Sequence, residues 1–293
     1  MKMHEHILEV ADKYEGILLD AYGVFWGGNA VGLFPGVTST LKELKARGKI
    51  IGVLSNSTQL SIPMMKKVGS HGMQKDHHYD FCITSGDIAK AVFTKDELPF
   101  ETHQKKYFLL HSHNPQYSSP YDLFDNSPFQ EAKQIEDADF IYLSIPHIQG
   151  KDQTNPEVFK QIVHDVMKHQ LPMVCANPDR FAHEGNPPQA VVRQGTIAGY
   201  YEQHGGKVIY FGKPAHVSFA KAMDQFNQLG LHDPSKILMV GDTPETDIRG
   251  AKNFGMSSAL IIETGVMQDR KNYILSDQET PQYYLRKLSA HDV

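Results

Sequence analysis

The chain has 293 residues, of which 40% are hydrophobic and 22% are charged, and its net charge at neutral pH is −5. This composition is ordinary for a globular protein, and the length allows two domains. Because the net charge is negative, nucleic-acid or anionic-membrane partners are not expected. The two cysteines, Cys82 and Cys175, lie inside apolar runs without CxxC spacing, so neither a disulfide framework nor a zinc site is indicated. Because no stretch has the character of a signal peptide or a membrane span, we expect a soluble cytoplasmic protein.

Short apolar runs rich in isoleucine and valine recur along the chain, and helical patterns follow most of them. Runs of this kind predict strands that are buried on both faces. The predicted strands are residues 17–19, 50–54, 81–83, 107–110, 140–143, 173–175, 208–211, 237–240 and 259–262. The predicted helices are residues 37–47, 61–71, 86–94, 156–169, 195–204, 216–229 and 246–254. This alternation predicts an α/β fold with a Rossmann-like, doubly wound parallel sheet.

Residues from about 99 to 137 break the alternation, because they concentrate proline, serine and asparagine, which favour loops. We interpret this segment as part of an inserted module and expect the first sheet to resume near Val208. The prediction is therefore a core domain formed by residues 1–87 and 208–293, with an α/β cap domain inserted at residues 88–207.

Polar residues stand directly after several of the predicted strands. In an open α/β sheet, ligands bind beyond the carboxyl ends of the strands, so these positions are candidates for a site. Asp20 follows the first predicted strand, and Ser55 follows the second. Lys213 follows the seventh, and Asp242 follows the eighth, with Asp247 on the loop beyond it.

The chemistry of this set indicates a phosphate and a divalent cation. Two carboxylates near each other at strand ends repel unless a cation lies between them, and an all-oxygen site suits Mg²⁺. Lys213 and Ser55 could hold phosphate oxygens, and Asp20 could attack phosphorus as a carboxylate nucleophile. Each residue alone also fits a turn, a helix cap or a loop. Their combination at strand ends, in this order, is what favours a phosphoryl-transfer site.

Four segments of the sequence resemble motifs one to four of the haloacid dehalogenase-like (HAD-like) phosphatases. They are Leu19-Asp20-Ala21-Tyr22-Gly23-Val24, Leu54-Ser55-Asn56-Ser57, Gly212-Lys213-Pro214 and Val240-Gly241-Asp242-Thr243-Pro244-Glu245-Thr246-Asp247. The flanking residues 248–255 and Thr264-Gly265-Val266 resemble class IIA of that superfamily, the subclass of sugar-phosphate, p-nitrophenyl phosphate and pyridoxal phosphate phosphatases. The resemblance covers nearly the whole chain, and its fourth motif is the most specific part.

The resemblance implies a role for each matching residue. Asp20 would be the nucleophile and a ligand of Mg²⁺, and Asp242 would be a second ligand. The backbone carbonyl of Tyr22 would be another ligand, and Asp247 would support the metal or its waters. The phosphoryl group would be held by Ser55, Asn56 and Lys213.

The resemblance also implies how the substrate is chosen. A type-C2 cap, here residues 88–207, would select a small phosphorylated metabolite. The loop at residues 175–180 is similar to the cap segment that faces the site in this subclass, which makes Asn177 and Asp179 candidate substrate-facing residues. Members of the subclass often dimerise through their caps, so a homodimer is a possible assembly.

Position 22 departs from the pattern of the family. The phosphatases carry a second aspartate there, which protonates the leaving alcohol and then deprotonates the hydrolytic water, whereas this chain has Tyr22. A tyrosine with a pKa of ~10 is a poor base at neutral pH. A slow phosphatase could borrow another base, such as His216 or a cap histidine; a phosphonate- or halide-type reaction could dispense with the acid. The simplest alternative is that the Tyr22 ring packs under the cap with Phe25 and Trp26.

The expectation from sequence is a Mg²⁺-dependent phosphohydrolase that acts through an aspartyl phosphate, slowed or restricted in substrate by Tyr22. The alternative is a catalytically impaired protein that binds a phospho-ligand and a metal for sensing or regulation. A receiver-like signalling domain uses similar residues but has the length of about one ordinary domain. The cap-sized insert and the motif at residues 241–247 argue against that reading.

Overall fold

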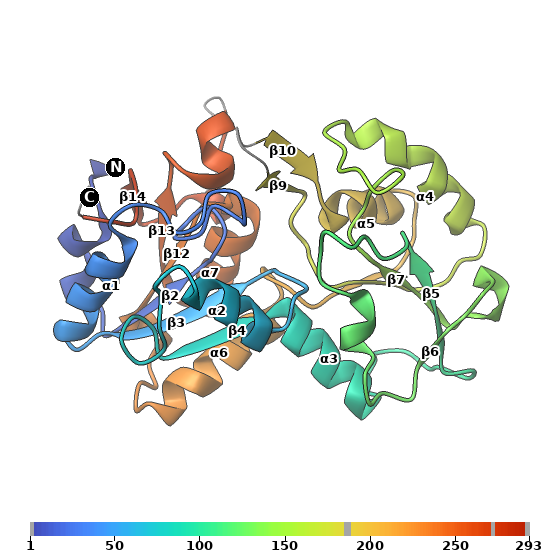
Figure 1. The fold of residues 1–293 in the computed structure, drawn as a ribbon, viewed down its shortest axis with the longest axis horizontal. Helices are drawn as coiled ribbons and strands as arrows, with labels where there is room; N and C mark the ends of the chain where they lie inside the picture. Colours follow the sequence, from blue (N-terminus) through green and yellow to red (C-terminus); the bar gives the residue numbers. More distant parts are fainter. Residues whose placement is uncertain (1–2, 185–188, 271–272, 291–293) are drawn as a thin grey trace.

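The computed structural model describes residues 3–184, 189–270 and 273–290. Two parallel sheets with their helices lie beside each other along the long axis of the molecule (Figure 1). The first and last described stretches of the chain lie on the side of the larger sheet that is remote from the second one (Figure 1). In the described part of the chain, none of the helices has the length and apolar character that crossing a membrane requires.

The larger sheet has seven strands in the order β1-β14-β13-β12-β2-β3-β4, and every pairing is parallel. The strands are β1 (Met3–His4), β2 (Gly16–Leu19), β3 (Ile50–Ser55), β4 (Phe81–Thr84), β12 (Ile237–Gly241), β13 (Ser257–Ile261) and β14 (Tyr283–Leu285). Its faces are covered by α1 (Val37–Ala46), α2 (Ser61–Gly69), α6 (His216–Gln228) and α7 (Arg249–Phe254).

Burial on both faces explains why these strands are short and apolar. In β2, Ile17 and Leu19 pack into the cluster under α1 and α2, whereas Leu18 points to the opposite cluster under α6. Successive side chains of a strand point to opposite faces, so a strand covered on both sides needs an apolar residue at every position. The predicted α/β class with a doubly wound parallel sheet is confirmed.

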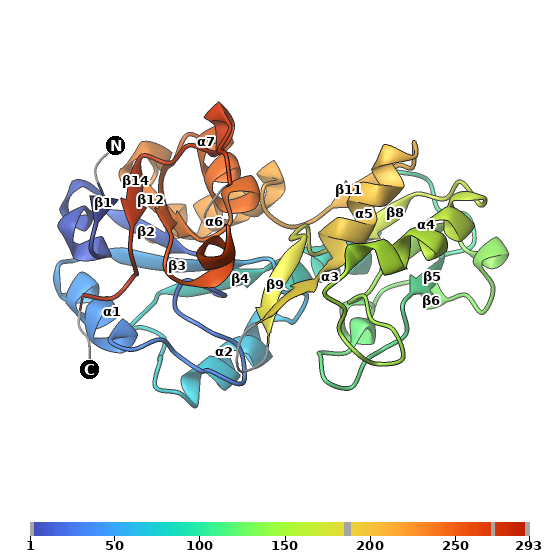
Figure 2. The same cartoon turned by 90° about the horizontal axis from the view of Figure 1, so that it is seen from above.

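The second sheet has five parallel strands in the order β11-β8-β7-β5-β6. The strands are β5 (Lys106–Leu110), β6 (Gln130–Glu131), β7 (Phe140–Leu143), β8 (Met173–Cys175) and β11 (Val208–Tyr210). One face packs on α4 (Lys160–Met167) and α5 (Gln194–Gln203), and the other packs on α3 (Ser85–Lys95) through an aromatic cluster around Phe93. An antiparallel hairpin, β9 (Phe181–Glu184) and β10 (Gln189–Val192), projects toward the larger sheet (Figure 2).

The predicted domain boundaries at residues 87/88 and 207/208 stay a prediction. Two contacts bear on where the chain passes between the sheets. The helix α3 packs its Ile88, Ala89 and Phe93 against the second sheet. The strand β11 pairs with β8 at the edge of that sheet, although the predicted core segment includes it. The return to the larger sheet therefore runs through the loop at Gly212, directly before Lys213.

Candidate active site

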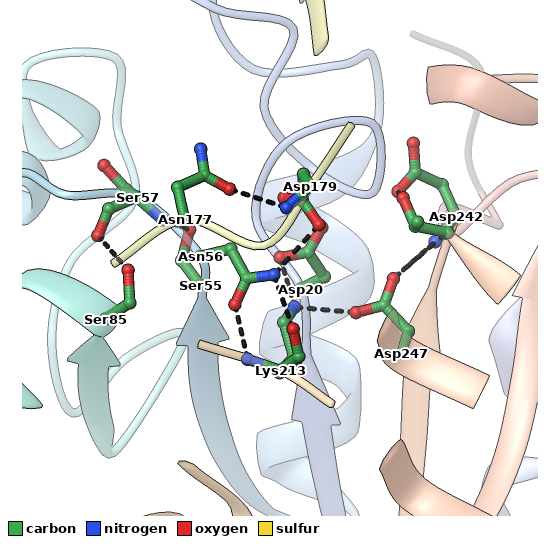
Figure 3. Close-up of polar contacts among 11 residues, drawn as sticks. Asp20, Ser55, Asn56, Ser57, Ser85, Asn177, Asp179, Lys213, Asp242 and Asp247 are labelled. Carbon is green, nitrogen blue, oxygen red and sulfur yellow. Dashed lines mark hydrogen bonds and ion pairs between the residues drawn. The ribbon is translucent and has the colours of Figure 1, made fainter. Parts of the chain in front are cut away.

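The candidate residues meet at the carboxyl edge of the larger sheet. Asp20 follows β2 and Asp242 follows β12, and these strands are parallel neighbours whose ends must meet. Asp20, Asp242 and Asp247 carry carboxylate oxygens that all lie within 4.8 Å of one another. Figure 3 shows Asp20 in the centre between Lys213 and Asp179, with Asp242 and Asp247 on one side and Asn56 on the other.

The fourth motif forms a loop that is held by its own last aspartate. Asp247 Oδ2 accepts hydrogen bonds from the backbone N–H of Asp242 at 3.1 Å and of Thr243 at 3.0 Å. A Cβ at Gly241 would lie 2.1 Å from the same oxygen, so only glycine fits. Asp247 is fully buried and thereby fixes the backbone that presents Asp242.

Two glycines press against the carboxylate of Asp242. A Cβ at Gly23 would lie 2.2 Å from Asp242 Oδ2, and a Cβ at Gly265 would lie 1.7 Å from it. Both glycines have a positive φ, of +78° and +64°, which other residues rarely adopt. The backbone N–H of Val266 then reaches Asp242 Oδ2 at 2.7 Å. The residues after β2 and after β13 therefore hold this carboxylate in one position.

Lys213 lies behind Asp20 and is 1% exposed. Its Nζ is 2.7 Å from Asp20 Oδ1 and 2.7 Å from Asp247 Oδ1. Burial alone would lower the pKa of Lys213, but the charges of Asp20, Asp247 and Asp179 raise it well above its usual value. The lysine is therefore a fixed positive charge in contact with the candidate nucleophile.

Negative charge exceeds positive charge in this cluster. Burial raises the pKa of Asp20 and that of Asp242, and the neighbouring carboxylate adds to the effect at Asp242. Burial likewise raises the pKa of Asp247, and that of Asp179, to about 6 in each case, although Lys213 opposes the shift. A hard divalent cation would relieve this repulsion, and the oxygen-only donors of Asp20, Asp242 and Asp247 fit Mg²⁺.

Asn56 connects neighbouring loops of the site through hydrogen bonds that the sequence does not predict. Its Nδ2 donates to Asp179 Oδ1 at 2.9 Å and to the backbone carbonyl of Lys213 at 3.1 Å. Its Oδ1 accepts from the backbone N–H of Lys213 at 2.7 Å. The side chain therefore joins three loops and has no N–H hydrogen left for a phosphate. Ser55 accepts a hydrogen bond from the backbone N–H of Ser57 at 3.2 Å, and its own hydroxyl hydrogen can still be donated.

Two cavities meet at Asp20 and Tyr22. The larger, called the polar cavity below, measures about 360 Å³, and its lining includes Asp20, Tyr22, Ser55, Asn56, Asn177 and Asp179. The smaller measures about 160 Å³, and its lining includes Asp242, Trp26, Phe34 and Phe181. Asn177 and Asp179, predicted to face a substrate, thus face the same space as Asp20, and Asn177 Oδ1 accepts the backbone N–H of Asp179 at 2.9 Å.

Tyr22 does not provide a base at this point of the site. Its ring packs against the buried cluster that contains Phe25 and Trp26, as the simplest reading of its sequence position expects. Burial, followed by the charge of Glu184, raises the pKa of Tyr22 to about 12, so it stays neutral at physiological pH. The suggested substitute base His216 is exposed, packs its ring on Phe254 and lines neither cavity.

Several further residues of the polar cavity were not predicted. They are Lys67, Gln59, Tyr117, Glu184 and Arg193. Glu184 is the last residue of β9, and Arg193 directly follows β10. The Gly-Asn-Pro-Pro sequence between the two strands is a turn signal that could have located the hairpin. Lys67 carries no such signal, because it belongs to an ordinary amphipathic helix.

Comparisons with known proteins agree with this fold. Residues 17–116 match the family model described as haloacid dehalogenase-like hydrolase, and residues 210–290 match a HAD-hydrolase-like model. The chain is 25% identical to a 4-nitrophenylphosphatase of Schizosaccharomyces pombe, over 96% of this chain and 94% of that protein. It is 27% identical to the sugar-phosphatase AraL of Bacillus subtilis, over 92% of this chain and 89% of that protein.

A solved structure with the same fold is a hydrolase of the haloacid dehalogenase-like family from Brucella suis 1330. It aligns with a TM-score of 0.79 at 23% identity, over 97% of this chain and 99% of that chain. The two family models both describe haloacid dehalogenase-like hydrolases and together match more than half of the chain, so the chain belongs to these hydrolases.

Proposed function

We propose that this protein is a Mg²⁺-dependent phosphohydrolase that acts on a small phosphorylated metabolite through an aspartyl phosphate on Asp20. The observation that carries the proposal is the contact of Lys213 Nζ with Asp20 Oδ1 at 2.7 Å, beside the buried carboxylates of Asp242 and Asp247. These residues would supply a nucleophile, a fixed cation and a set of metal ligands at one sheet edge. The named phosphatase relatives support the same reaction type.

The first half-reaction follows from these positions. Lys213 holds Asp20 Oδ1, so we assign Oδ2 as the atom that attacks phosphorus while the bond to the leaving oxygen breaks. Lys213 and the hydroxyl of Ser55 would donate to the oxygens of the transferring group. Asp20, Asp242, the Tyr22 carbonyl and Asp247 would hold Mg²⁺, which would supply the remaining positive charge.

Position 22 matters in both half-reactions, because the leaving alcohol needs a proton in the first one and a neutral tyrosine with a pKa of about 12 is a weak acid. Hydrolysis of the aspartyl phosphate needs a group that takes a proton from the attacking water, and Tyr22 is neutral with a pKa of about 12. General acid–base catalysis typically contributes ~10²–10⁴ in rate. We therefore propose that turnover is slow and that substrates with good leaving groups react best. The same observation favours the second candidate, a phospho-ligand- and metal-binding protein that is phosphorylated without turning over.

A phosphatase screen with Mg²⁺ tests the proposal, using the native chain, Asp20→Asn and Tyr22→Asp. Phosphate release that disappears in Asp20→Asn and rises in Tyr22→Asp is the expected result. A native chain that binds Mg²⁺ and phosphate but hydrolyses no substrate would support the binding function instead. Activity that survives in Asp20→Asn would remove Asp20 as the nucleophile. The homodimer and the cytoplasmic location stay predictions.

A further inference from the structure

The polar cavity extends from Asp20 to residues that the proposed reaction does not use. On one side lie Gln59, just before α2, and Lys67, on α2, which covers the larger sheet. On the other side lie Tyr117, Glu184 and Arg193, from the segments around the second sheet. These walls surround the space that the non-reacting part of a substrate would occupy when its phosphate lies at Asp20.

The charge of Arg193 is already matched within the protein. Its guanidinium lies 3.2 Å from Asp152 Oδ1 and 3.1 Å from Glu184 Oε1, and it also donates to the Tyr117 hydroxyl at 3.1 Å. Arg193 is only 3% exposed, and Tyr117 donates a further short hydrogen bond to Asp152. Arg193 therefore joins three side chains of the cavity wall, and the hydrogen-bond donors of its two terminal nitrogens are used within the protein.

Lys67 is different, because its charge is not matched. Among the described residues, its Nζ donates to Gln59 Oε1 at 3.3 Å and forms no ion pair. The side chain is half-buried against the polar cavity, and this burial lowers the pKa of Lys67, partly offset by the more distant Glu184. A partly desolvated ammonium with only an amide partner is stabilised by any anion that enters the cavity.

We propose that Lys67 selects substrates whose leaving group carries a second anionic group, a carboxylate or another phosphate. The inference rests on the proposed phosphohydrolase function. With the reacting phosphate at Asp20, the second anion would accept a hydrogen bond from Lys67. Lys213 cannot take this role, since its Nζ is held at the reacting end of the site, 2.7 Å from both Asp20 Oδ1 and Asp247 Oδ1.

Matched substrate pairs test the proposal. The carboxylate pair is 3-phosphoglycerate against glycerol 3-phosphate, and the phosphate pair is fructose 1,6-bisphosphate against fructose 1-phosphate. Because a hydrogen bond to a charged group is worth about 1.5–3 kcal/mol, the native chain should prefer the anionic member of at least one pair by ~10–100-fold in kcat/KM. The pair that shows the preference identifies the anion.

The lysine itself is tested with Lys67→Met and with a matched control on the same helix, Lys66→Met, whose side chain is exposed. Lys67→Met should remove the preference by raising KM for the anionic substrate, while turnover of 4-nitrophenyl phosphate stays within about twofold of native. Lys67→Arg should restore part of it, and Lys66→Met should change nothing. Equal losses on charged and neutral substrates in Lys67→Met, or no preference in the native chain, would overturn the proposal.

A failure of the proposed function gives a different result. In that case 4-nitrophenyl phosphate is not hydrolysed by the native chain, and the same pairs are compared as ligands by calorimetry in the presence of Mg²⁺. Tighter binding of the anionic member, lost in Lys67→Met, supports the role of Lys67 without catalysis. Equal binding of both members contradicts it.

Discussion

The charge imbalance at the acidic cluster predicts that Mg²⁺ stabilises the fold, and that it does so more at high pH than at low pH. The pKa of Asp247 is about 6 in the folded chain without metal, against an ordinary value of 3.8. The folded state therefore binds more protons than the unfolded state between these values. By linkage, its free energy of unfolding falls as pH rises from about 4 to about 6, and it stays lower above that range.

The size of the effect follows from the shift. A rise of roughly two pKa units at a fully buried carboxylate corresponds to about 3 kcal/mol of lost stability above pH 6. About 1.4 kcal/mol of this loss falls between pH 5 and pH 8, because the unfolded carboxyl group is already ionised at pH 5. At about 2 °C per kcal/mol for a chain of this size, the metal-free midpoint should therefore be lower at pH 8 than at pH 5 by about 3 °C. Mg²⁺ competes with protons for the same oxygens, so it should restore most of that loss at pH 8 and have little effect at pH 5.

Thermal unfolding followed by circular dichroism, with and without MgCl₂ at both pH values, measures this difference. Asp242→Asn is the matched variant, because it keeps the shape and removes one charge. It should be more stable than the native chain without metal at pH 8 and should lose the Mg²⁺ effect. An equal Mg²⁺ shift at pH 5 and pH 8, or a full shift in Asp242→Asn, would refute the reasoning.

Three further substitutions have defined outcomes. Gly265→Ala should weaken Mg²⁺ binding by at least about tenfold, because its Cβ would lie 1.7 Å from Asp242 Oδ2. The control Gly230→Ala, with φ +89° and no atom within 4 Å, should cost only about 1 kcal/mol of stability, or about 2 °C in the thermal midpoint, and leave Mg²⁺ titrations unchanged. Tyr22→Asp should speed phosphate release from sugar phosphates by ~10²-fold or more in a steady-state assay, and an unchanged rate would mean that another group already acts as the base. Asn56→Ala should lower kcat through loss of its three hydrogen bonds while Mg²⁺ affinity stays native, whereas an effect confined to KM would contradict its positioning role.

The central strands could be predicted because each is buried on both faces. β2, β3 and β12 need apolar residues at consecutive positions, and such runs stand out in the sequence. β14 was not predicted, since its sequence Tyr-Tyr-Leu is only three residues long and is half-buried at its start. The hairpin strand β9, Phe-Ala-His-Glu, is only partly buried along its whole length and lacks an apolar run.

The acidic cluster could be predicted from the sequence for a related reason. Asp20 and Asp242 each follow a recognisable strand, and parallel neighbours bring their carboxyl ends to one edge. The polar cavity could not be predicted from the sequence. Lys67 and Glu184 line the same space only because of the way the β9–β10 hairpin lies relative to the larger sheet. The elements that carry them, α2 and β9, are far apart in the sequence and lie on two sides of this one space, and no local periodicity in either element encodes that arrangement.

Acid-quench trapping tests the central claim most directly. The native chain is mixed with acetyl phosphate and Mg²⁺, quenched in acid within the turnover time, digested, and examined by mass spectrometry for a phosphorylated peptide. A phosphate on the peptide that carries Asp20, absent without Mg²⁺ and absent in Asp20→Asn, is the predicted result. Phosphate release that proceeds with no label on that peptide, or label on another residue, would contradict the account.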